Sequence, residues 1–311
     1  MAVTVTLNPC FDRTLAVSGF HHGGVNRVLQ SRQDMGGKGI NVSAALKALG
    51  LPTICLGFHF EDGAEALENM LESQNIPGDF VLCPGAVRVN TKIFEQDTGV
   101  MTELNERGAA VSRDRLEALL EKARAYAQTH PFFVISGSVP PGTPADFYQT
   151  LIKTIREANP AAFVALDAEG SLLLNGLKAR PQMIKPNRFE LESLVGTRLD
   201  SRAEILQKCR ELIGEGVQLV CVSLGGDGAV IASAESAYFS PPMKLNVKSL
   251  HGAGDNMLAG ACKGILENRT LEDILRCAAA AAAGSLEREG TLPCRKQDFD
   301  RLYPLARAEP L

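Results

Sequence analysis

Four consecutive residues, Gly252-Ala253-Gly254-Asp255, carry the clearest chemical signal in the chain. Two glycines let a backbone turn tightly and approach a ligand closely. The residues that follow, from Asn256 onward, are expected to begin a helix, whose free N–H groups and partial positive charge attract an anion. A carboxylate at the mouth of such a pocket can take a proton from a neighbouring hydroxyl. The turn therefore predicts a site for phosphoryl transfer to an alcohol.

A second glycine-rich turn, Gly36-Gly37-Lys38-Gly39, lies near the N-terminus and is closely followed by Asn41. Its backbone N–H groups, an ammonium and an amide at the start of an expected helix can hold a polyol or a phosphate. Asp12, just past an expected first strand, could accept hydrogen bonds from sugar hydroxyls. A plain helix-initiating turn and a solvated strand-end carboxylate remain the alternatives.

Two later segments contain groups suited to a nucleotide and its metal ion. Asn187 and Glu190 are one helical turn apart and could organise a hydrated Mg²⁺, although a helix cap with a surface glutamate is the alternative. The run Ser223-Leu224-Gly225-Gly226-Asp227-Gly228 follows an expected strand, where the edge of an open sheet can receive a nucleotide. A tight hairpin is compatible with the same run. The sequence contains neither a P-loop nor a complete dinucleotide fingerprint.

Composition excludes several classes of function. The net charge of −4 argues against a nucleic-acid binder that works by bulk electrostatics. Eight scattered cysteines without a C-x-x-C pair, and five histidines without an H-x-x-x-H pair, predict reduced thiols in a cytoplasmic protein and no zinc site. We expect no signal peptide and no membrane-spanning segment.

Strand-like apolar runs alternate with helical periodicity from about residue 110. Strands are expected at residues 132–136, 163–167 and 217–223. Helices are expected at residues 112–128, from Thr143-Pro144, and after a capping box at Ser201 and Glu204. Because the apolar runs are continuous, they favour a parallel sheet that is covered on both faces. The predicted fold class is α/β, with a doubly wound, mostly parallel sheet.

Residues 10–34 and 86–107 depart from this rhythm, because their apolar and polar residues alternate. They are expected to form antiparallel strands outside the main sheet, in a small β-sheet lid over its ligand-binding edge. Two ordinary edge hairpins are the alternative. The lid is taken as inserted in one domain, residues 1–311. The six alanines at residues 278–283 predict a closely packed helix.

Together and in this order, the motifs resemble the ribokinase-like (PfkB) family of carbohydrate kinases over essentially the whole chain. Within the family, the sequence is most similar to the branch that acts on phosphosugars. The segments that carry the resemblance are Thr6-Leu7-Asn8-Pro9, residues 36–42, Arg88-x-Asn90-x-Lys92, Ser136-Gly137-Ser138-Val139-Pro140-Pro141-Gly142, residues 185–190, residues 223–228 and residues 252–255.

The resemblance implies a role for each motif. Asp255 would be the base that deprotonates the acceptor hydroxyl, and Gly252, Ala253 and Gly254 would form the anion hole. The residues implied to hold the sugar phosphate are Asp12, Gly37, Lys38, Asn41, Ser138, Arg88, Asn90, Lys92 and Arg27. Those implied to bind ATP are Lys185, Asn187, Ser223, Gly225, Gly226, Gly228, Ala280 and Gly284. Asn187 and Glu190 would meet Mg²⁺ indirectly, through water or phosphate.

The resemblance therefore implies an ATP- and Mg²⁺-dependent kinase of a phosphorylated ketohexose. Fructose 1-phosphate is the best single prediction, with fructose 1,6-bisphosphate as product; tagatose 6-phosphate and fructose 6-phosphate remain alternative substrates. A nucleoside kinase and a non-catalytic sugar-binding protein of the same fold are further alternatives, but a neutral substrate would leave Arg88 and Lys92 unpartnered. A remote phosphate held by two cations can position the reacting hydroxyl. The branch also implies a homodimer formed through the lid.

Three positions depart from the usual pattern of the family. His251 precedes the glycines, Asn256 follows the catalytic aspartate, and Cys10-Phe11 occupies the segment before Asp12. None of them removes a catalytic group. They leave the identity of the sugar open.

Overall fold

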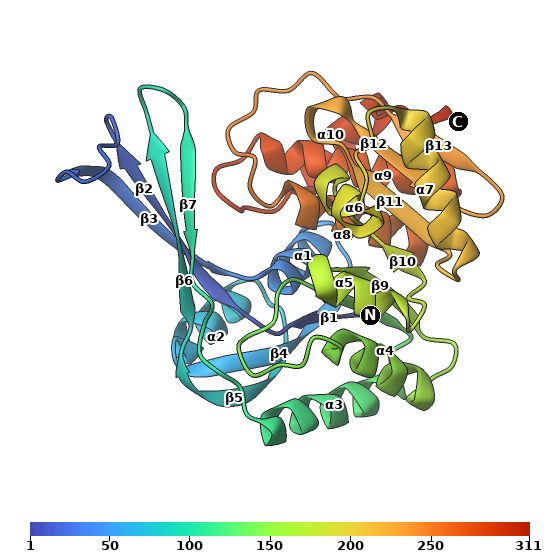
Figure 1. Ribbon diagram of the computed structural model, residues 1–311, viewed down its shortest axis with the longest axis horizontal. Coiled ribbons are helices and arrows are strands. Elements are labelled where there is room, and N and C mark those ends of the chain that lie inside the picture. The colour runs from blue at the N-terminus through green and yellow to red at the C-terminus, as the bar shows by residue number, and fades with distance from the viewer.

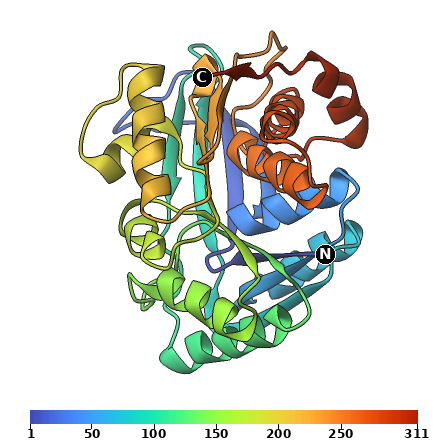
Figure 2. The same cartoon turned by 90° about the vertical axis from the view of Figure 1, so that its right-hand side faces the viewer.

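A ten-stranded sheet runs through the molecule and carries helices on both faces (Figure 1, Figure 2). The structure is a computed structural model and describes all 311 residues. The strands from β11 to β5 pair in parallel, whereas β12, β13 and β14 pair antiparallel, which confirms the predicted fold class. In spatial order the strands are β14 (Glu309–Pro310), β13 (Ala237–Ser240), β12 (Ala229–Ala232), β11 (Leu219–Ser223), β10 (Met183–Ile184), β9 (Phe163–Asp167), β8 (Phe132–Ser136), β1 (Ala2–Thr6), β4 (Thr53–Asp62) and β5 (Gly78–Ala86).

Helices form a layer on each face of this main sheet, and Figure 2 shows α7 and the α8–α9 pair on opposite sides of it. One layer contains α1 (Lys38–Ala48), α2 (Ala64–Ser73), α8 (Ala253–Leu266) and α9 (Leu271–Leu286), with α10 (Lys296–Leu302) packed on α9. The other layer contains α3 (Arg113–Ala127), α4 (Phe147–Ala158), α5 (Gly170–Leu177), α6 (Arg188–Val195) and α7 (Arg202–Gly214).

Adjacent residues of the central strands pack against different helical layers. In β8, Ile135 belongs to the core under α3, α4 and α5, while Val134 belongs to the core under α1, α8 and α9. Both are fully buried. Since neighbouring side chains of a strand point to opposite faces, a strand covered on both sides must be apolar throughout. This is the physical reason for the continuous apolar runs in the sequence.

The helix predicted at Thr143-Pro144 begins later, at Phe147. The N–H of Phe147 donates to the carbonyl of Pro144 over 3.0 Å, so these residues form a turn that precedes α4. Thr143 does not cap the helix, because its hydroxyl has no hydrogen-bond partner. The preceding Gly142 has a φ of +86°, and a Cβ there would lie 2.6 Å from the carbonyl oxygen of Val111. The chain at Gly142 therefore packs closely against Val111, and the helix begins only after this contact, at Phe147.

A separate four-stranded sheet, here called the small sheet, stands beside the main one. Its strands are β3 (Val28–Gly36), β2 (Cys10–Val17), β6 (Arg88–Glu95) and β7 (Met101–Asn105), in that order. The hairpins β2–β3 and β6–β7 are antiparallel, as predicted, but the central pair β2–β6 is parallel. The prediction of antiparallel pairing throughout was wrong at this pair. Because β2 and β6 both leave the main sheet from the same end of their parallel predecessors β1 and β5, they run outward side by side.

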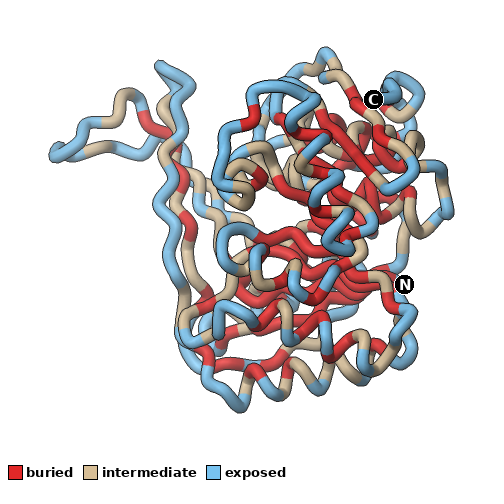
Figure 3. The backbone as a smooth tube through the Cα atoms, turned by 45° about the vertical axis from the view of Figure 1, so that its right-hand side comes forward, coloured by how far each residue is buried: buried red, intermediate tan, exposed pale blue.

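The small sheet projects from the body of the protein, as Figure 1 shows at the side opposite α7 and β13. Its outer ends are exposed, whereas burial concentrates in the main sheet and its helices (Figure 3). The base of the small sheet adjoins the carboxyl ends of the parallel strands. In an open α/β sheet this edge is where ligands bind.

All eight cysteines are free and buried, as predicted for reduced thiols. Burial raises the pKa of the Cys221 thiol to about 12, so this group stays protonated and unreactive. Among the helices, none combines the length and the apolar character needed to cross a bilayer.

Candidate active site

The turn before α8 has the geometry of an anion site. Gly252 occupies the N-cap position in the left-handed region, with a φ of 76°, which glycine adopts without strain. The ammonium of Lys185 lies 3.5 Å from the point where a side chain at Gly254 would begin. Positive charge from the helix N-terminus and from Lys185 therefore converges on this turn.

Asn256 braces the turn. Its Nδ2 donates to the carbonyl of Gly252 over 2.9 Å, and its Oδ1 accepts from the N–H of Cys294 over 2.8 Å. The residue is 1% exposed and does not line the cavity beside Asp255. Asn256, which departs from the family pattern, thus stabilises the backbone of the turn.

Asp255 is a buried carboxylate at the first turn of α8 and is 7% exposed. Its Oδ2 accepts a hydrogen bond from Asn41 Nδ2 over 2.8 Å. Burial raises the pKa of Asp255 to about 6, and the nearby charge of Asp167 adds to this, whereas Asn41, Lys38 and Lys185 act in the opposite direction. A carboxylate with this pKa is ionised at neutral pH and is a better proton acceptor than an exposed aspartate.

Asp255 opens into a cavity of about 320 Å³ that lies between the main sheet and the small sheet. Most of the predicted sugar-binding residues meet there, although they come from distant parts of the chain. They are Asp12, Gly37, Lys38, Asn41, Arg88, Asn90, Lys92 and Ser138. Arg27 is the exception: it is exposed in the connection between β2 and β3, and it does not line this cavity.

The small sheet contributes two cations, Arg88 and Lys92, to this cavity. Arg88, Asn90 and Lys92 alternate along β6, so their side chains share one face of the strand. Lys92 Nζ lies 3.3 Å from Asp12 Oδ1 on the adjacent strand. Arg88 donates to the backbone carbonyls of Glu106 and Asn8, and its buried Nε has no partner. An unpartnered donor and a buried ammonium on one face are suited to an anionic ligand.

A buried aspartate that the sequence analysis did not select organises the other wall. Asp167 ends β9 and is 2% exposed; its Oδ1 lies 3.4 Å from Lys185 Nζ, and its Oδ2 accepts from Ser136 Oγ over 3.2 Å. Burial alone would raise the pKa of Asp167, but Lys185 and Lys38 outweigh it and the net shift is downward. The same carboxylate raises the pKa of Lys38. The sequence did contain a signal that could have identified Asp167, namely its position at the carboxyl end of a predicted strand.

Other lining residues were also missed. Glu103 and Asn105 belong to β7, Glu169 follows β9, and His251 and Thr291 belong to loops on either side of α8 and α9. Single polar residues in loops and edge strands have no distinctive spacing. Only the folded chain brings them to the same cavity.

A second cavity, of about 540 Å³, adjoins the anion turn and is largely apolar. The predicted nucleotide residues Asn187, Ser223, Gly225, Gly226 and Gly228 line it. The remaining lining is Ala229, Ser240, Pro241, Pro242, Met243, Leu245, Val247, Leu250, Ala253, Gly254, Met257, Ala279, Ala282, Ala283 and Leu286. Ala253 and Gly254 also belong to the turn. A ligand whose apolar ring lies in this cavity could therefore place an attached phosphate chain near Asp255.

Ala280 and Gly284 do not line this cavity, so the structure does not bring them together with the other predicted nucleotide residues. Ala280 packs with α10, and a Cβ at Gly284 would lie 2.2 Å from Cys294 Sγ. On a helix, residues three and four apart share a face. The face of α9 that lines the cavity is the one with Ala279, Ala282 and Ala283.

Asn187 and Glu190 form a reciprocal capping box at the start of α6. Asn187 Oδ1 accepts from the N–H of Glu190 and Glu190 Oε2 accepts from the N–H of Asn187, each over 2.8 Å. Both side chains are therefore occupied in the cap. Burial raises the pKa of Glu190, and Asp167 adds to this shift.

The carboxylates near α6 do not by themselves form a closed site for the predicted Mg²⁺. No group of three or more His, Cys, Asp or Glu side chains is arranged to enclose a metal ion. Asp167 Oδ1 is buried without a hydrogen-bond partner, and Glu190 faces the same charged cluster. Mg²⁺ commonly keeps several waters and binds through one or two carboxylates and substrate phosphates. The residues fit an ion held in that indirect way.

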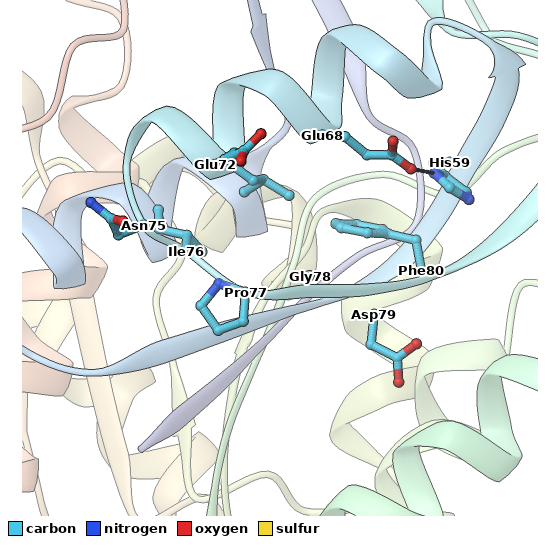
Figure 4. A pocket seen from close by; sticks show the side chains of 10 residues that line it. His59, Glu68, Glu72, Asn75, Ile76, Pro77, Gly78, Asp79 and Phe80 are labelled. Atoms are coloured by element: carbon cyan, nitrogen blue, oxygen red, sulfur yellow. Dashed lines mark ion pairs between the residues drawn. The ribbon is translucent and has the colours of Figure 1, made fainter.

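A third hollow, of about 560 Å³, lies at the edge of the main sheet between α2 and β5 (Figure 4). His59 Nδ1 is 3.7 Å from Glu68 Oε1, and the His59 and Phe80 rings stack 5.7 Å apart. Asp79 is paired with Lys122. His59 Nδ1 is buried and has no hydrogen-bond partner. None of these groups lines the cavities beside Asp255.

Comparison with known proteins places these observations in a family. The sequence matches the pfkB family of carbohydrate kinases over residues 5–298. It is 33% identical over 288 residues to the 1-phosphofructokinase of Vibrio cholerae, covering 93% of this chain and 90% of that enzyme. It is 34% identical over 276 residues to the 1-phosphofructokinase of Bacillus subtilis, covering 89% of each.

Solved structures agree with the sequence comparison. The fold is similar to that of phosphofructokinase-2 from Escherichia coli in complex with potassium, with a TM-score of 0.90 and 27% identity over 97% of this chain and 98% of the other. The tetrameric inhibited form of that enzyme gives a TM-score of 0.89 and 27% identity, covering 98% of each chain.

The elevated pKa of Asp255 predicts an effect on stability. A carboxyl whose pKa is higher in the folded than in the unfolded protein destabilises the fold above its ordinary pKa, and this penalty grows as pH rises through about 6. Asp255→Asn should therefore raise the free energy of unfolding by about 1–3 kcal/mol at pH 7.5. The gain should shrink as pH is lowered toward 4. Urea denaturation at several pH values measures it, and an equal or lower stability at pH 7.5 would contradict the charge assignment.

Proposed function

The chain belongs to the pfkB family of carbohydrate kinases, and we propose that it transfers the γ-phosphoryl group of ATP to fructose 1-phosphate. The product is fructose 1,6-bisphosphate. One observation carries the proposal: a single cavity holds a buried base beside an anion turn and, on the facing sheet, the cations Arg88 and Lys92. The relatives named 1-phosphofructokinase support the same substrate.

In the proposed reaction, Asp255 accepts the proton of the acceptor hydroxyl as that oxygen attacks the γ-phosphorus. The bond between the γ-phosphorus and the bridging oxygen breaks, and ADP leaves. Asn41 holds the carboxylate of Asp255 in place. The N–H groups of the turn and the ammonium of Lys185 face the charge that develops on the transferring group.

The acceptor sugar is proposed to lie between the two sheets. Asp12, Asn41, Ser138 and the backbone at Gly37 would bind its hydroxyls, with Lys38 near the reacting end. Arg88 and Lys92 would bind the phosphate that the sugar already carries, with Asn90 between them. Binding energy from this remote phosphate can orient the reacting hydroxyl toward Asp255. A neutral sugar or a nucleoside would leave Arg88 without a counter-charge, whereas Lys92 is already paired with Asp12.

ATP is proposed to occupy the apolar cavity next to the turn, with Ser223, Gly225, Gly226, Gly228 and Asn187 around it. Mg²⁺ is the proposed cofactor, near Glu190 and Asp167. When bound, it would neutralise phosphate charge and orient the transferring group. Glu190 also caps α6 through the backbone of Asn187, which fixes where its carboxylate lies.

A homodimer is proposed through the small sheet. Exposed apolar side chains gather on its strands and connections: Val25, Val28, Leu29, Val100, Met101 and Leu104. Apolar surface of this kind marks protein interaction sites. Arg27 lies in the exposed connection between β2 and β3, so in a dimer it would face the partner rather than its own cavity.

A substrate panel tests the proposed function directly. ATP turnover should be fastest with fructose 1-phosphate, slower with fructose 6-phosphate and tagatose 6-phosphate, and lowest with unphosphorylated hexoses, because these lack the anion that Arg88 and Lys92 bind. The measurement is coupled ADP release at saturating ATP and Mg²⁺. Activity confined to the unphosphorylated sugars would overturn the assignment.

The role of Asp255 predicts the pH profile as well as a mutant phenotype. Asp255→Ala should lower kcat by at least about 10²-fold while the KM for ATP changes little. In the wild-type enzyme the base must be ionised, so kcat should fall on the acid side of a pKa near 6. Steady-state rates of both proteins between about pH 5 and about pH 8 measure the loss of kcat in the variant and the pH dependence of kcat in the wild type. Turnover of the variant near the wild-type rate would remove Asp255 from the mechanism.

Arg88 is expected to act on the sugar phosphate alone. Arg88→Ala should raise the KM for fructose 1-phosphate by about 10- to 100-fold, the value of a charge-assisted hydrogen bond. The KM for ATP should stay within about twofold. Arg13→Ala is the matched control, because Arg13 is an exposed arginine of the small sheet whose position in β2 points to the opposite face from Asp12. Equal rises in both KM values would contradict the assignment.

A further inference from the structure

Ser240 carries an unused hydroxyl in the wall of the apolar cavity next to the anion turn. The residue ends β13 and is 1% exposed, and its Oγ has no hydrogen-bond partner. Buried hydroxyls in proteins are normally hydrogen-bonded, because their removal from water without a partner is unfavourable. The reaction proposed above makes no use of this group. A ligand in the cavity is therefore the natural source of the missing partner.

The pairing of the strands turns this side chain toward α8 and α9. Ser240 lies opposite Ala229 in the antiparallel β12–β13 pair, so both side chains are on the same face of the sheet. Ala229 belongs to the core under α8 and α9, whereas Phe239 belongs to the core on the other face. Met257 of α8 and Ala282 of α9 line the same cavity as Ser240. The hydroxyl therefore faces the space between the sheet and these two helices.

Ser240 lies far from the phosphate end of the cavity. Lys185, which follows β10, marks that end, because its ammonium lies beside Gly254 of the anion turn. The strands β10, β11, β12 and β13 are consecutive neighbours in the main sheet. Adjacent strands are about 4.8 Å apart, so the end of β13 is roughly 14 Å from the end of β10 along the sheet. With the phosphates of ATP at the turn, the base is the part of the nucleotide that extends toward Ser240.

Ser240 is the only side-chain oxygen at this end of the cavity. The other lining residues with a side-chain oxygen are Asn187 and Ser223, which form a parallel bridge next to Lys185. Asn187 Oδ1 is already occupied in the cap of α6. Residues 241 and 242, which follow Ser240, are prolines and have no N–H to offer. A polar group that enters between the apolar residues at this end thus meets the Ser240 hydroxyl.

We propose that Ser240 is a specificity-determining residue for the nucleotide, and that its Oγ accepts a hydrogen bond from the exocyclic amino group of adenine. The inference rests on the proposed function, because it places ATP in this cavity. The adenine ring packs among the apolar lining, where its amino group loses water. A serine hydroxyl has two acceptor lone pairs, so it replaces the lost water. A site that binds a polar group in this way discriminates against an analogue that lacks the group.

Purine riboside 5′-triphosphate, which has hydrogen in place of the amino group of ATP, tests the contact together with Ser240→Ala. In the wild-type protein with Mg²⁺, calorimetry should give a Kd for the analogue about 3- to 10-fold higher than for ATP, the effect of one neutral hydrogen bond. Ser240→Ala should raise the Kd for ATP by about the same factor and change the Kd for the analogue by less than about twofold, because both changes remove one contact. Ser240→Thr, which keeps the oxygen, should bind ATP within about threefold of wild type.

Kinetics separate this role from a merely structural one. Ser240→Ala should raise the KM for ATP by about 3- to 10-fold, while kcat and the KM for fructose 1-phosphate stay within about twofold. The matched control is Ser193→Ala, because Ser193 is an exposed serine of α6 that lines neither cavity. The control should change neither KM.

Equal losses for ATP and the analogue in Ser240→Ala, or no loss for either, would overturn the contact with the amino group. The binding measurements need no sugar, so they decide the role of Ser240 whichever sugar phosphate the enzyme prefers. A wild-type protein that binds ATP but does not use fructose 1-phosphate would reject the proposed substrate alone. A wild-type protein that binds no ATP would reject both the nucleotide cavity and the role of Ser240.

Discussion

The burial of a negative charge at Asp255 is the constraint on which the rest of the site depends. A carboxylate removed from water is costly, and here a second carboxylate, Asp167, lies close enough to increase that cost. The helix N-terminus, Lys38, Lys185 and the amide of Asn41 supply the compensation. The same groups are then available to a transferring phosphoryl group. In the proposed reaction, charge balance in the resting protein and stabilisation of the transferring group would therefore use one set of residues.

The parallel sheet explains why these groups meet. Asp167, Lys185 and Ser223 lie at or just beyond the carboxyl ends of β9, β10 and β11, and parallel strands bring those ends to one edge. The small sheet adds what this edge lacks, which is a face of alternating polar and basic side chains. Because β2 and β6 leave the body side by side, Asp12, Asn90 and Lys92 come together without any helix between them. The cavity beside Asp255 is thus lined by the edge of the main sheet on one side and by the small sheet on the other.

Much of the fold and of the site was predictable from the sequence, because the signals were local. Glycine turns, capping boxes and continuous apolar runs each depend on a few neighbouring residues, and they located Gly252, Gly37, Ser201 and the central strands. Features that depend on contacts between segments far apart in the chain could not be predicted. The turn before α4 is held by Val111, the parallel pairing of β2 with β6 depends on where both strands start, and the face that α9 presents is chosen by its packing on α10.

The sequence by itself determined the fold class, the glycine turn ahead of Asp255, and the presence of a basic strand, because each depends on a short run of residues. The tertiary structure alone decided that Asp167 lies beside Lys38 and Lys185, that Asn256 links the turn to Cys294 by a hydrogen bond, and that His251 Nδ1 lies 3.7 Å from Glu103 Oε1. These are contacts between residues far apart in the chain. Their distances are set by how whole sheets and helical layers pack, and that packing leaves no local pattern in the sequence.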